Sequence, residues 1–278
     1  MSMTVTLLGT GSPLPDPNRA GPATLVQAGG ANLLVDAGRG VVMRLAGAGL
    51  FPSAVTGVLL THLHSDHLCG LNDVVTSHWV TSPGPTPLPV HGPVGTAEVV
   101  AGMLAMLGPD VRYRLAHHDD LTAGPDVEVV EHRPGDEFEL GGCRICAHAT
   151  DHRPVEPTLG YRIEQAGTVV AVAGDTVPCP GLDELCAGAD AYVQTVIRDD
   201  LVRNVPSARL QDILDYHSTV AQAGETAARA GVGTLVLTHY VPPLARGQED
   251  EWRAVAAERF DGEIVLGDDL TAVTVGQP

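Results

Sequence analysis

Short apolar stretches alternate with polar segments along the whole chain, and their lengths predict a protein built from both strands and helices. Stretches of about four to eight apolar residues bounded by Gly, Pro, Asn or Asp are typical of strands. Segments with apolar positions three to four residues apart predict helices. We expect strands at residues 3–8, 23–26, 32–35, 57–60, 88–92, 127–130, 136–140, 144–149, 161–164, 169–173, 191–196, 234–237 and within 264–275, and helices at residues 40–49, 70–82, 96–107, 181–186, 220–230 and 249–260.

The order of these elements gives two halves, each with strands followed by helices, and no repeat of short period. The proline-rich segment 82–89 cannot be helical, and we expect a loop there because a strand follows directly. The polar stretch 113–124, which holds His117 and His118, is predicted to be a surface loop. A chain of 278 residues that is 44% apolar can bury a sizeable core, so we expect a single domain over residues 1–278.

Charge and cysteine content limit the expected partners and the expected cell compartment. The net charge is −18, and all 16 basic residues are Arg. An acidic chain has few groups to neutralise phosphates, so we do not expect nucleic acid as a partner. There is no apolar run of transmembrane length and no signal-peptide pattern, so we expect no membrane partner. The five scattered cysteines predict free thiols and a cytoplasmic protein.

Candidate chemistry concentrates in residues 61–67, Thr-His-Leu-His-Ser-Asp-His, directly after the strand predicted at 57–60. Imidazole nitrogen and carboxylate oxygen are ligands that Zn²⁺ prefers. His62 and His64 point the same way from an extended segment, whereas Asp66 and His67 lie past the bend. The alternative is a solvated His-rich loop, and the position directly after an apolar strand argues against it. The spacing therefore predicts the beginnings of two adjacent metal sites.

Three more strand ends each deliver one residue of a metal-ligand type, namely His152, Asp175 and His239. Loops at strand ends can bring such distant residues together. His148 is an alternative to His152, because it lies on the same predicted strand. We favour His152, which follows the end of that strand.

A further histidine, His217, begins a His-Ser-Thr sequence directly before the helix predicted at 220–230. Its imidazole could protonate, or donate a hydrogen bond to, a leaving oxygen. Alternatively the segment is a helix start, at which Ser218 or Thr219 caps the helix. Both roles are compatible.

Residues 62–67 carry the His-x-His-x-Asp-His signature, and the order of the other candidates makes the chain resemble the metallo-β-lactamase superfamily from end to end. The opening strand followed by Gly-Thr-Gly-Ser at residues 9–12 is similar to the RNase Z-like and arylsulfatase-like branches, and the His-Ser-Thr sequence resembles RNase Z. The resemblance implies an α/β fold, a four-layer αββα sandwich. It also implies a homodimer.

The same resemblance implies two divalent metal ions, with Zn²⁺ expected and Mn²⁺ or Fe as alternatives. It implies that an aspartate at the end of the strand at 32–35, Asp36, supports the metals through hydrogen bonds. It implies three ligands for the first ion, three for the second and one bridge: His62, His64 and His152; Asp66, His67 and His239; and Asp175.

The implied reaction is hydrolysis, in which a metal-bridged hydroxide attacks an ester. Asp66 would orient or deprotonate the attacking water, and His217 would stabilise the leaving oxygen. A complete ligand set argues against a non-catalytic member of the superfamily.

Two departures from the RNase Z pattern bear on the substrate. Residues 161–175 leave no room for a basic arm, and Gln194 stands where the family has an acidic residue. We therefore expect a small phosphodiester or sulfate ester as the substrate, with Arg198 and Arg203 as candidates to bind its anionic group. The alternatives are a tRNA 3′-processing endoribonuclease (RNase Z) and a hydrolase of lactones or other esters.

Overall fold

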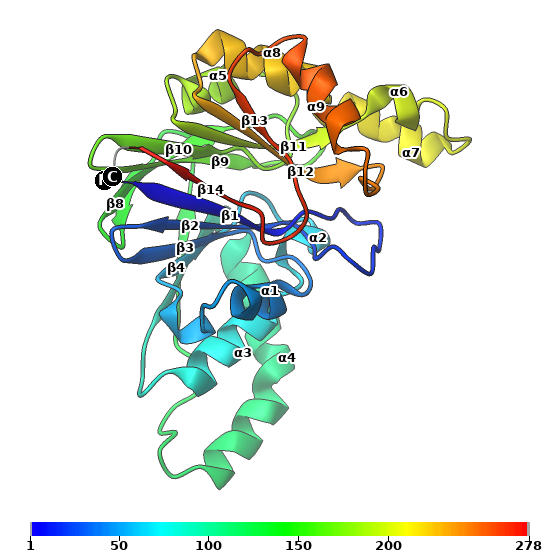
Figure 1. Ribbon diagram of the computed structural model, residues 1–278. Helices are drawn as coiled ribbons and strands as arrows, with labels where there is room; N and C mark the ends of the chain where they lie inside the picture. The colour runs from blue at the N-terminus through cyan, green and yellow to red at the C-terminus, as the bar shows by residue number, and fades with distance from the viewer. Residues whose placement is uncertain (1, 277–278) are drawn as a thin grey trace.

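Two β-sheets packed face to face form the centre of the molecule (Figure 1). The computed structural model describes residues 2–276, and within them each sheet has seven strands. The first sheet has the order β14-β1-β2-β3-β4-β5-β6, and the second has the order β13-β12-β11-β10-β9-β8-β7. The strands are β1 (Met3–Gly9), β2 (Ala23–Ala28), β3 (Ala31–Val35), β4 (Gly57–Leu59), β5 (Leu88–Pro93), β6 (Val127–His132), β7 (Glu137–Leu140), β8 (Cys143–Ala149), β9 (Leu159–Gln165), β10 (Thr168–Val172), β11 (Ala191–Ile197), β12 (Thr234–Val241), β13 (Glu263–Val265) and β14 (Ala272–Val275).

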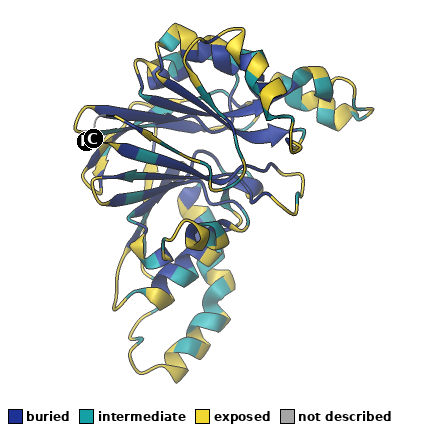
Figure 2. Ribbon diagram, in the orientation of Figure 1, coloured by how far each residue is buried: buried dark blue, intermediate teal, exposed yellow. Residues whose placement is uncertain are grey.

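Most strands are apolar on both sides because each sheet is covered on both faces. In β3, Leu33 and Val35 face the other sheet, whereas Leu34 packs under the outer helices. In β11, Val193 faces the other sheet and Tyr192 faces outward. Successive side chains of a strand point to opposite faces, so one apolar run serves two cores. Figure 2 shows the central strands mostly in the colour of buried residues, whereas the strands β6, β7, β13 and β14 at the sheet edges are largely intermediate or exposed.

Helices cover the outer face of each sheet and complete four layers (Figure 1). The helices α1, α3 and α4 lie on the side of the first sheet, and α5, α8 and α9 lie on the side of the second. The expected αββα sandwich is therefore confirmed. The bounds are α1 (Val41–Gly47), η1 (Pro52–Ala54), α2 (Ser65–Leu68), α3 (Leu71–Thr81), α4 (Thr96–His117), α5 (Pro180–Cys186), α6 (Asp199–Val202), α7 (Ala208–Asp212), η2 (Ile213–Asp215), α8 (Val220–Ala230) and α9 (Glu249–Ala257).

Parallel pairing brings several strand ends to one edge of the sandwich. The strands β3, β4, β5 and β6 run parallel to one another, and so do β10, β11, β12 and β13. The carboxyl ends of parallel strands share an edge, which is where open α/β sheets place their sites. The segments after β4 and β10, together with the end of β12, therefore lie close together.

The predicted loop at 113–124 is wrong in its first part, because α4 continues to His117. The helix runs through Pro109 and extends away from the sandwich (Figure 1). Thr96 and Val100, both near the start of α4, are its only buried residues. The rest of the helix therefore has no buried apolar face of the kind that a packed helix has. A local ion pair between Asp110 and Arg114, 2.8 Å apart, supports its outer part instead;.

Two further differences from the expected elements lie near the edge of the sandwich that holds the candidate ligand residues. The segment 198–209, for which the apolar pattern predicts no helix, contains α6 and the start of α7. The strand β12 continues past the expected end at residue 237, so that His239 lies within it. Both elements are short or irregular extensions that depend on contacts with the rest of the fold.

Two further expectations concern membrane-spanning helices and the cysteines. Within residues 2–276, no helix combines the length and apolarity that crossing a bilayer requires. All five cysteines are free, as expected, and Cys143 and Cys146 both lie on β8.

A buried hydrogen bond between the two sheets gives the first prediction. The Tyr161 hydroxyl on β9 donates to the Leu60 carbonyl oxygen at 2.7 Å, just before the metal-ligand segment. Tyr161→Phe should lower the free energy of unfolding by about 1–3 kcal/mol, because the buried carbonyl loses this partner. Urea denaturation measures the change. Tyr113→Phe is the matched control, since Tyr113 is 71% exposed on α4 and should change nothing. An equal effect of both substitutions would contradict the prediction.

Candidate metal centre

The signature segment folds as its spacing predicts. After β4 the backbone stays extended through His64, and α2 then begins at Ser65. His62 and His64 project from the extended part, while Asp66 and His67 lie on the helix and are buried. The change from strand spacing to helix spacing therefore sends the two pairs into two groups.

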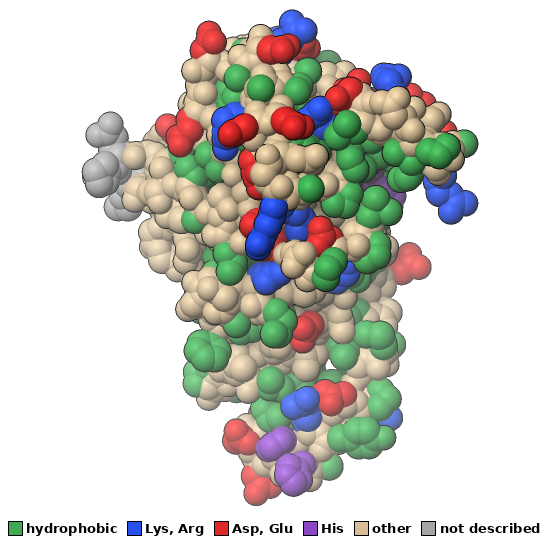
Figure 3. Space-filling view, turned by 45° about the vertical axis from the view of Figure 1, so that its right-hand side comes forward, with side chains coloured by type: hydrophobic (Ala, Val, Ile, Leu, Met, Phe, Trp, Pro, Cys, Tyr) green, Lys and Arg blue, Asp and Glu red, His purple; other side chains and the backbone are tan. Residues whose placement is uncertain are grey.

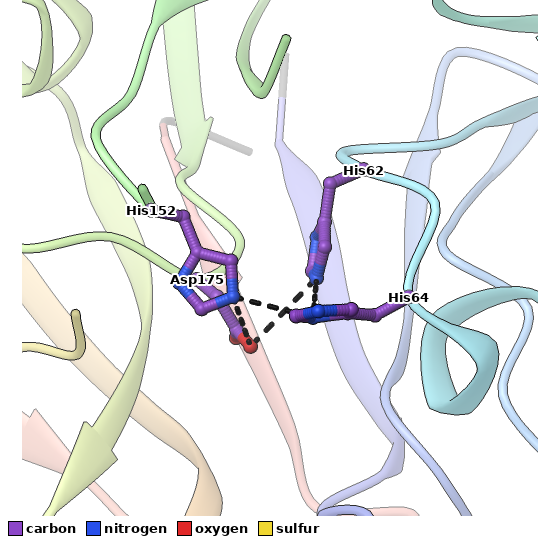
Figure 4. Close-up of side chains that lie close together, drawn as sticks. All are labelled: His62, His64, His152 and Asp175. Carbon is purple, nitrogen blue, oxygen red and sulfur yellow. Dashed lines mark hydrogen bonds and ion pairs between the residues drawn. The ribbon is translucent and has the colours of Figure 1, made fainter. Parts of the chain in front are cut away.

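The first cluster consists of His62, His64, His152 and Asp175 (Figure 4). The Nδ1 atom of His64 lies 3.1 Å from His62 Nε2 and 3.3 Å from His152 Nε2. The Oδ2 atom of Asp175 lies 3.9 Å from His62 Nε2 and 3.8 Å from His152 Nε2. Four potential ligand atoms from three separate segments therefore face one point.

The second cluster consists of Asp66, His67 and His239, and it uses the same Asp175 oxygen. Asp66 Oδ2 lies 3.7 Å from His67 Nε2 and 3.4 Å from His239 Nε2. Asp175 Oδ2 lies 3.4 Å from His67 Nε2 and 3.6 Å from His239 Nε2. The carboxylate of Asp175 thus stands between the two clusters, where a bridging ligand would stand.

The donor atoms fit a divalent metal ion in type and in spacing. Metal–nitrogen and metal–oxygen bonds of about 2.1 Å put the ligand atoms of a tetrahedral Zn²⁺ about 3.4 Å apart, close to the separations in both clusters. His67 Nε2 and Asp175 Oδ1 are buried and make no hydrogen bond among the described residues. Buried polar atoms normally have partners, so these atoms indicate a ligand that neutralises them.

Burial and neighbouring charges set the protonation states in the first cluster. Burial lowers the pKa of His152 to about 4, and it lowers the pKa of His62 well below its usual value. Burial alone would favour a neutral Asp175, but the imidazoles of His239 and His67 outweigh it and hold the pKa of Asp175 well below its usual range. Neutral imidazole and ionised carboxylate are the metal-binding forms.

His67 shows the opposite balance. Burial lowers its pKa, but the Asp175 and Asp36 carboxylates outweigh burial and raise the pKa of His67 well above its usual value. A proton on His67 partly neutralises the buried carboxylates in the metal-free chain. A metal ion must displace that proton, so metal binding should release protons.

Hydrogen bonds behind the clusters orient the ligand side chains. His67 donates from Nδ1 to Asp36 Oδ2 at 2.8 Å, and Asp36 also accepts from the Thr61 backbone nitrogen at 2.8 Å. His152 donates from Nδ1 to the Tyr216 carbonyl oxygen at 2.8 Å. Such outer partners fix the tautomer that leaves Nε2 free for a metal. The sequence predicted Asp36 but gave no signal for a backbone carbonyl such as that of Tyr216.

The backbone is strained at two of these positions. Asp36 has φ 59° and His239 has φ 54°, a left-handed conformation that residues other than Gly rarely adopt;. Strain of this kind persists only where surrounding structure imposes it. At both positions it turns a side chain toward the clusters.

The structure distinguishes between the two alternative candidates, His148 on β8 and His152 just after it. His152 is buried with Nε2 in the first cluster, whereas His148 Nδ1 lies 3.8 Å from Glu184 at the α5 side. His117 and His118 are exposed at the end of α4, outside both clusters.

His217 lies beside Asp175, the candidate bridging residue, and precedes α8. Its Nε2 is 3.2 Å from Asp175 Oδ2, and its Nδ1 donates to the Ile213 carbonyl oxygen at 3.1 Å. The alternative role as a helix start belongs to Thr219, whose hydroxyl accepts from the Gln222 backbone nitrogen in a capping box;. Both expected features of the His-Ser-Thr sequence therefore occur together.

A hollow of about 500 Å³ adjoins the first cluster next to His152. Its walls come from the segment after β8 and from the start of α5, and they include Arg153, Thr158 and Cys179. The expected anion binder Arg198 is instead buried and paired with Asp200 at 2.7 Å. Arg203, the other candidate, is paired with Asp199 at 3.5 Å and lies on the outer side of α6.

Comparison with known proteins identifies the family. The model of the beta-lactamase superfamily domain matches residues 31–240. Together with the sandwich and its clusters of His and Asp, this match shows that the chain belongs to the metallo-β-lactamase superfamily. The fold also agrees with the metallo-beta-lactamase fold protein YhfI from Bacillus subtilis, at 22% identity and a TM-score of 0.77, over 98% of this chain and 99% of that one.

Full-length relatives define the branch. A protein named Ribonuclease Z from Mycobacterium avium is 59% identical, and one from Mycolicibacterium paratuberculosis is 58% identical, each over 276 residues and 99% of both chains. The chain therefore belongs to the RNase Z-like branch. Human tRNase Z, short form, has the same fold, with a TM-score of 0.72 and 22% identity over 99% of this chain and 100% of that one. The arylsulfatase part of the expectation has no specific support.

These relatives contradict the expectation of a small-molecule ester as substrate and of no nucleic-acid partner. The expectation used the net charge of the whole chain, but binding depends on the charge near the site. Figure 3 shows basic side chains close together on one face, with acidic side chains among them. Arg19, Arg44 and Arg246 line one hollow, in which Arg19 is paired with Asp268 and Arg44 with Asp269. The missing arm does not separate the chain from these relatives either, because the matched regions cover 99% of both chains.

The positions of His152 and His148 give the second prediction. His152→Ala should lower the metal content and abolish hydrolysis, because it removes one donor of the first cluster. His148→Ala is the matched control and should retain metal, since its side chain lies toward Glu184. Elemental analysis of both variants measures the metal-to-protein ratio. A metal-deficient His148 variant beside an unaffected His152 variant would reverse the assignment.

The hydrogen bonds of Asp36 give the third prediction. Asp36→Asn keeps the shape of the side chain but removes its charge and one acceptor oxygen, so His67 loses its partner. Metal affinity should fall about 10- to 100-fold, the usual cost of losing such a partner. Competition with a chelator measures the affinity. Asp73→Asn on the exposed side of α3 is the control, and unchanged affinity in the Asp36 variant would argue against this role.

Proposed function

We propose that this protein is a metal-dependent ribonuclease that removes the 3′ extension of precursor tRNA. The observation that carries the proposal is the pair of donor clusters that share Asp175 Oδ2, in a chain that matches proteins named Ribonuclease Z over its full length. The clusters would hold two divalent ions, with Zn²⁺ expected from the donors. His62, His64 and His152 would hold one ion, Asp66, His67 and His239 would hold the other, and Asp175 would bridge them.

Two ions bound there would polarise the phosphoryl oxygens and lower the pKa of water toward neutrality. The chain supplies the orientation. In the metal-free chain burial raises the pKa of Asp66, but the hydrogen bond from His239 outweighs burial and lowers the pKa of Asp66. The positive charge of bound ions would replace that hydrogen bond, because His239 Nε2 would then bind metal. The Asp66 carboxylate is therefore ionised at neutral pH and accepts a proton or a hydrogen bond from the attacking water.

His217 would act on the opposite side of the scissile phosphate. Its Nδ1 donates to the Ile213 carbonyl oxygen, so the ring cannot rotate freely, and its Nε2 points toward the Asp175 bridge. In the imidazolium form, Nε2 carries a proton that can pass to the leaving oxygen as the P–O bond breaks. The ring is buried, which keeps this proton away from bulk water.

Local charge supports an RNA substrate despite the acidic composition. Arg39 and Arg246 have no carboxylate within ion-pair distance in residues 2–276, and each lines a surface hollow. Arg39 lies directly after Gly38, whose neighbour Ala37 donates its backbone N–H to the His67 carbonyl oxygen at 2.7 Å. Arg39 therefore places a guanidinium group without a carboxylate partner close to the segment that carries His67, where a phosphate of a bound strand would pass. In the free protein this group donates to the backbone oxygens of Ser12, Pro13 and Leu14.

Cleavage of precursor tRNA is the fourth prediction. The metal-loaded protein should cut a precursor with a 3′ trailer at one position, and the rate constant kcat/KM should fall steeply with salt because phosphates are neutralised on binding. Gel analysis of end-labelled RNA gives both the position and the rate. Asp175→Ala should be inactive, since it removes the shared donor.

The control substrate is a small aryl phosphodiester. Hydrolysis of this ester together with no cleavage of precursor tRNA, at low salt and full metal content, would show that the metal centre works but that the proposed substrate is wrong.

A further inference from the structure

The side chain of Tyr216 lies beside His152 and His217 and has no role in the chemistry described so far. Tyr216 follows η2 and directly precedes His217. Its carbonyl oxygen accepts the hydrogen bond from His152 Nδ1 at 2.8 Å. The main chain of Tyr216 is therefore fixed to the first cluster, while its side chain remains partly exposed.

The ring of Tyr216 packs on two site histidines. Its centroid lies 5.2 Å from that of His152, with an interplanar angle of 74°, and 4.8 Å from that of His217, with an angle of 44°. Ile213 and Leu214 of η2 pack against Ile197, Val202 and Val241, which anchors the segment that carries the ring. An anchored, partly exposed aromatic ring beside the catalytic imidazole is a preformed stacking surface.

The hydroxyl group distinguishes Tyr216 from the buried tyrosines. Tyr161, Tyr192 and Tyr240 each donate a hydrogen bond from the hydroxyl to another residue of the core. Within residues 2–276, the Tyr216 hydroxyl makes no such bond. The structural role of this residue is thus carried by its carbonyl oxygen, and the fold does not otherwise use its ring edge or hydroxyl.

We propose that Tyr216 stacks on the nucleobase of the nucleoside that carries the leaving oxygen. This inference rests on the proposed ribonuclease function. The scissile phosphate would lie at the ions that share Asp175. His217 Nε2 lies 3.2 Å from Asp175 Oδ2, and in the proposed reaction it faces the leaving oxygen. Tyr216 flanks His217, so the base attached on that side lies next to the ring.

Stacking suits a chain of net charge −18. Every nucleobase has an aromatic face, so stacking gives affinity without sequence preference and without additional positive charge. It would also fix the position of the last nucleoside relative to the metals. Tyr216 is therefore assigned as a positioning residue for the base, separate from the arginines that would contact phosphates.

A double-mutant cycle between protein and RNA tests the assignment, as the fifth prediction. Tyr216→Ala should lower kcat/KM for precursor tRNA about 5- to 150-fold, the range expected for one base–aromatic stack, and Tyr216→Phe should retain most activity. An RNA that is abasic at the nucleoside of the leaving oxygen should show the same loss with the wild-type protein. Tyr216→Ala should then add no further loss on that RNA.

Matched controls separate stacking from structural damage. Tyr113→Ala on α4 should leave all rates unchanged, because Tyr113 is remote and 71% exposed. Metal content is measured for each variant, since Tyr216 supports His152 through its backbone. If Tyr216→Ala loses metal, Tyr216→Leu, which fills space without an aromatic face, takes its place in the cycle.

Several results would overturn the assignment. Additive losses from Tyr216→Ala and the abasic RNA would show that the two groups do not interact. A loss in Tyr216→Phe as large as in Tyr216→Ala would assign the effect to the hydroxyl. Coupling to an abasic site on the other side of the scissile phosphate would refute the assigned base. In each case the wild-type protein still cleaves RNA, whereas failure of the ribonuclease proposal would leave intact RNA with a metal-loaded wild-type protein.

Discussion

The two candidate metal clusters depend on the contacts of one buried carboxylate, that of Asp175. Its Oδ2 atom lies within 4 Å of Nε2 of five histidines, at 3.2 Å from His217, 3.4 Å from His67, 3.6 Å from His239, 3.8 Å from His152 and 3.9 Å from His62. Burying a charge without a partner costs several kcal/mol or more. The ring of imidazoles, with protons or with metal ions, is what stabilises this carboxylate inside the fold.

The sandwich provides the geometry that this carboxylate requires. Asp175 follows β10, the signature histidines follow β4, and His239 lies near the end of β12, so both sheets deliver ligands to one edge. Short-range hydrogen bonds then set the ligand orientation, as Asp36 does for His67. The strained backbone at Asp36 and His239 shows that the surrounding structure outweighs local preference at these positions;.

The acidic composition led to a wrong expectation about the partner, and the physical reason is general. Net charge sums over the whole surface, whereas a strand of RNA meets only the groups along its path. Among residues 2–276 most arginines are paired with carboxylates, as Arg144 is with Glu137, whereas Arg39, which follows the Asp36 segment, and Arg246 are not. Two divalent ions in the clusters would add further positive charge at the point of cleavage, and stacking at Tyr216 would add affinity without charge.

The sequence by itself determined the strands, most of the helices and the local geometry of residues 61–67. Apolar runs mark buried strands wherever they occur, and the spacing of His62, His64, Asp66 and His67 follows directly from a strand that turns into a helix. These features depend on neighbours along the chain. The family resemblance extended them to the ligand order and to the four-layer fold.

Only the tertiary structure decided the features that depend on distant contacts. It placed His152, which follows β8, in the first cluster and turned His148, which lies on β8, toward Glu184. It extended α4 to His117 without a buried face, and it made the Tyr216 carbonyl a partner of His152. Neither local periodicity nor residue type carries that information, because a backbone carbonyl is present at every position and an exposed helix has no apolar stripe. Long-range packing selects among such equivalent local choices.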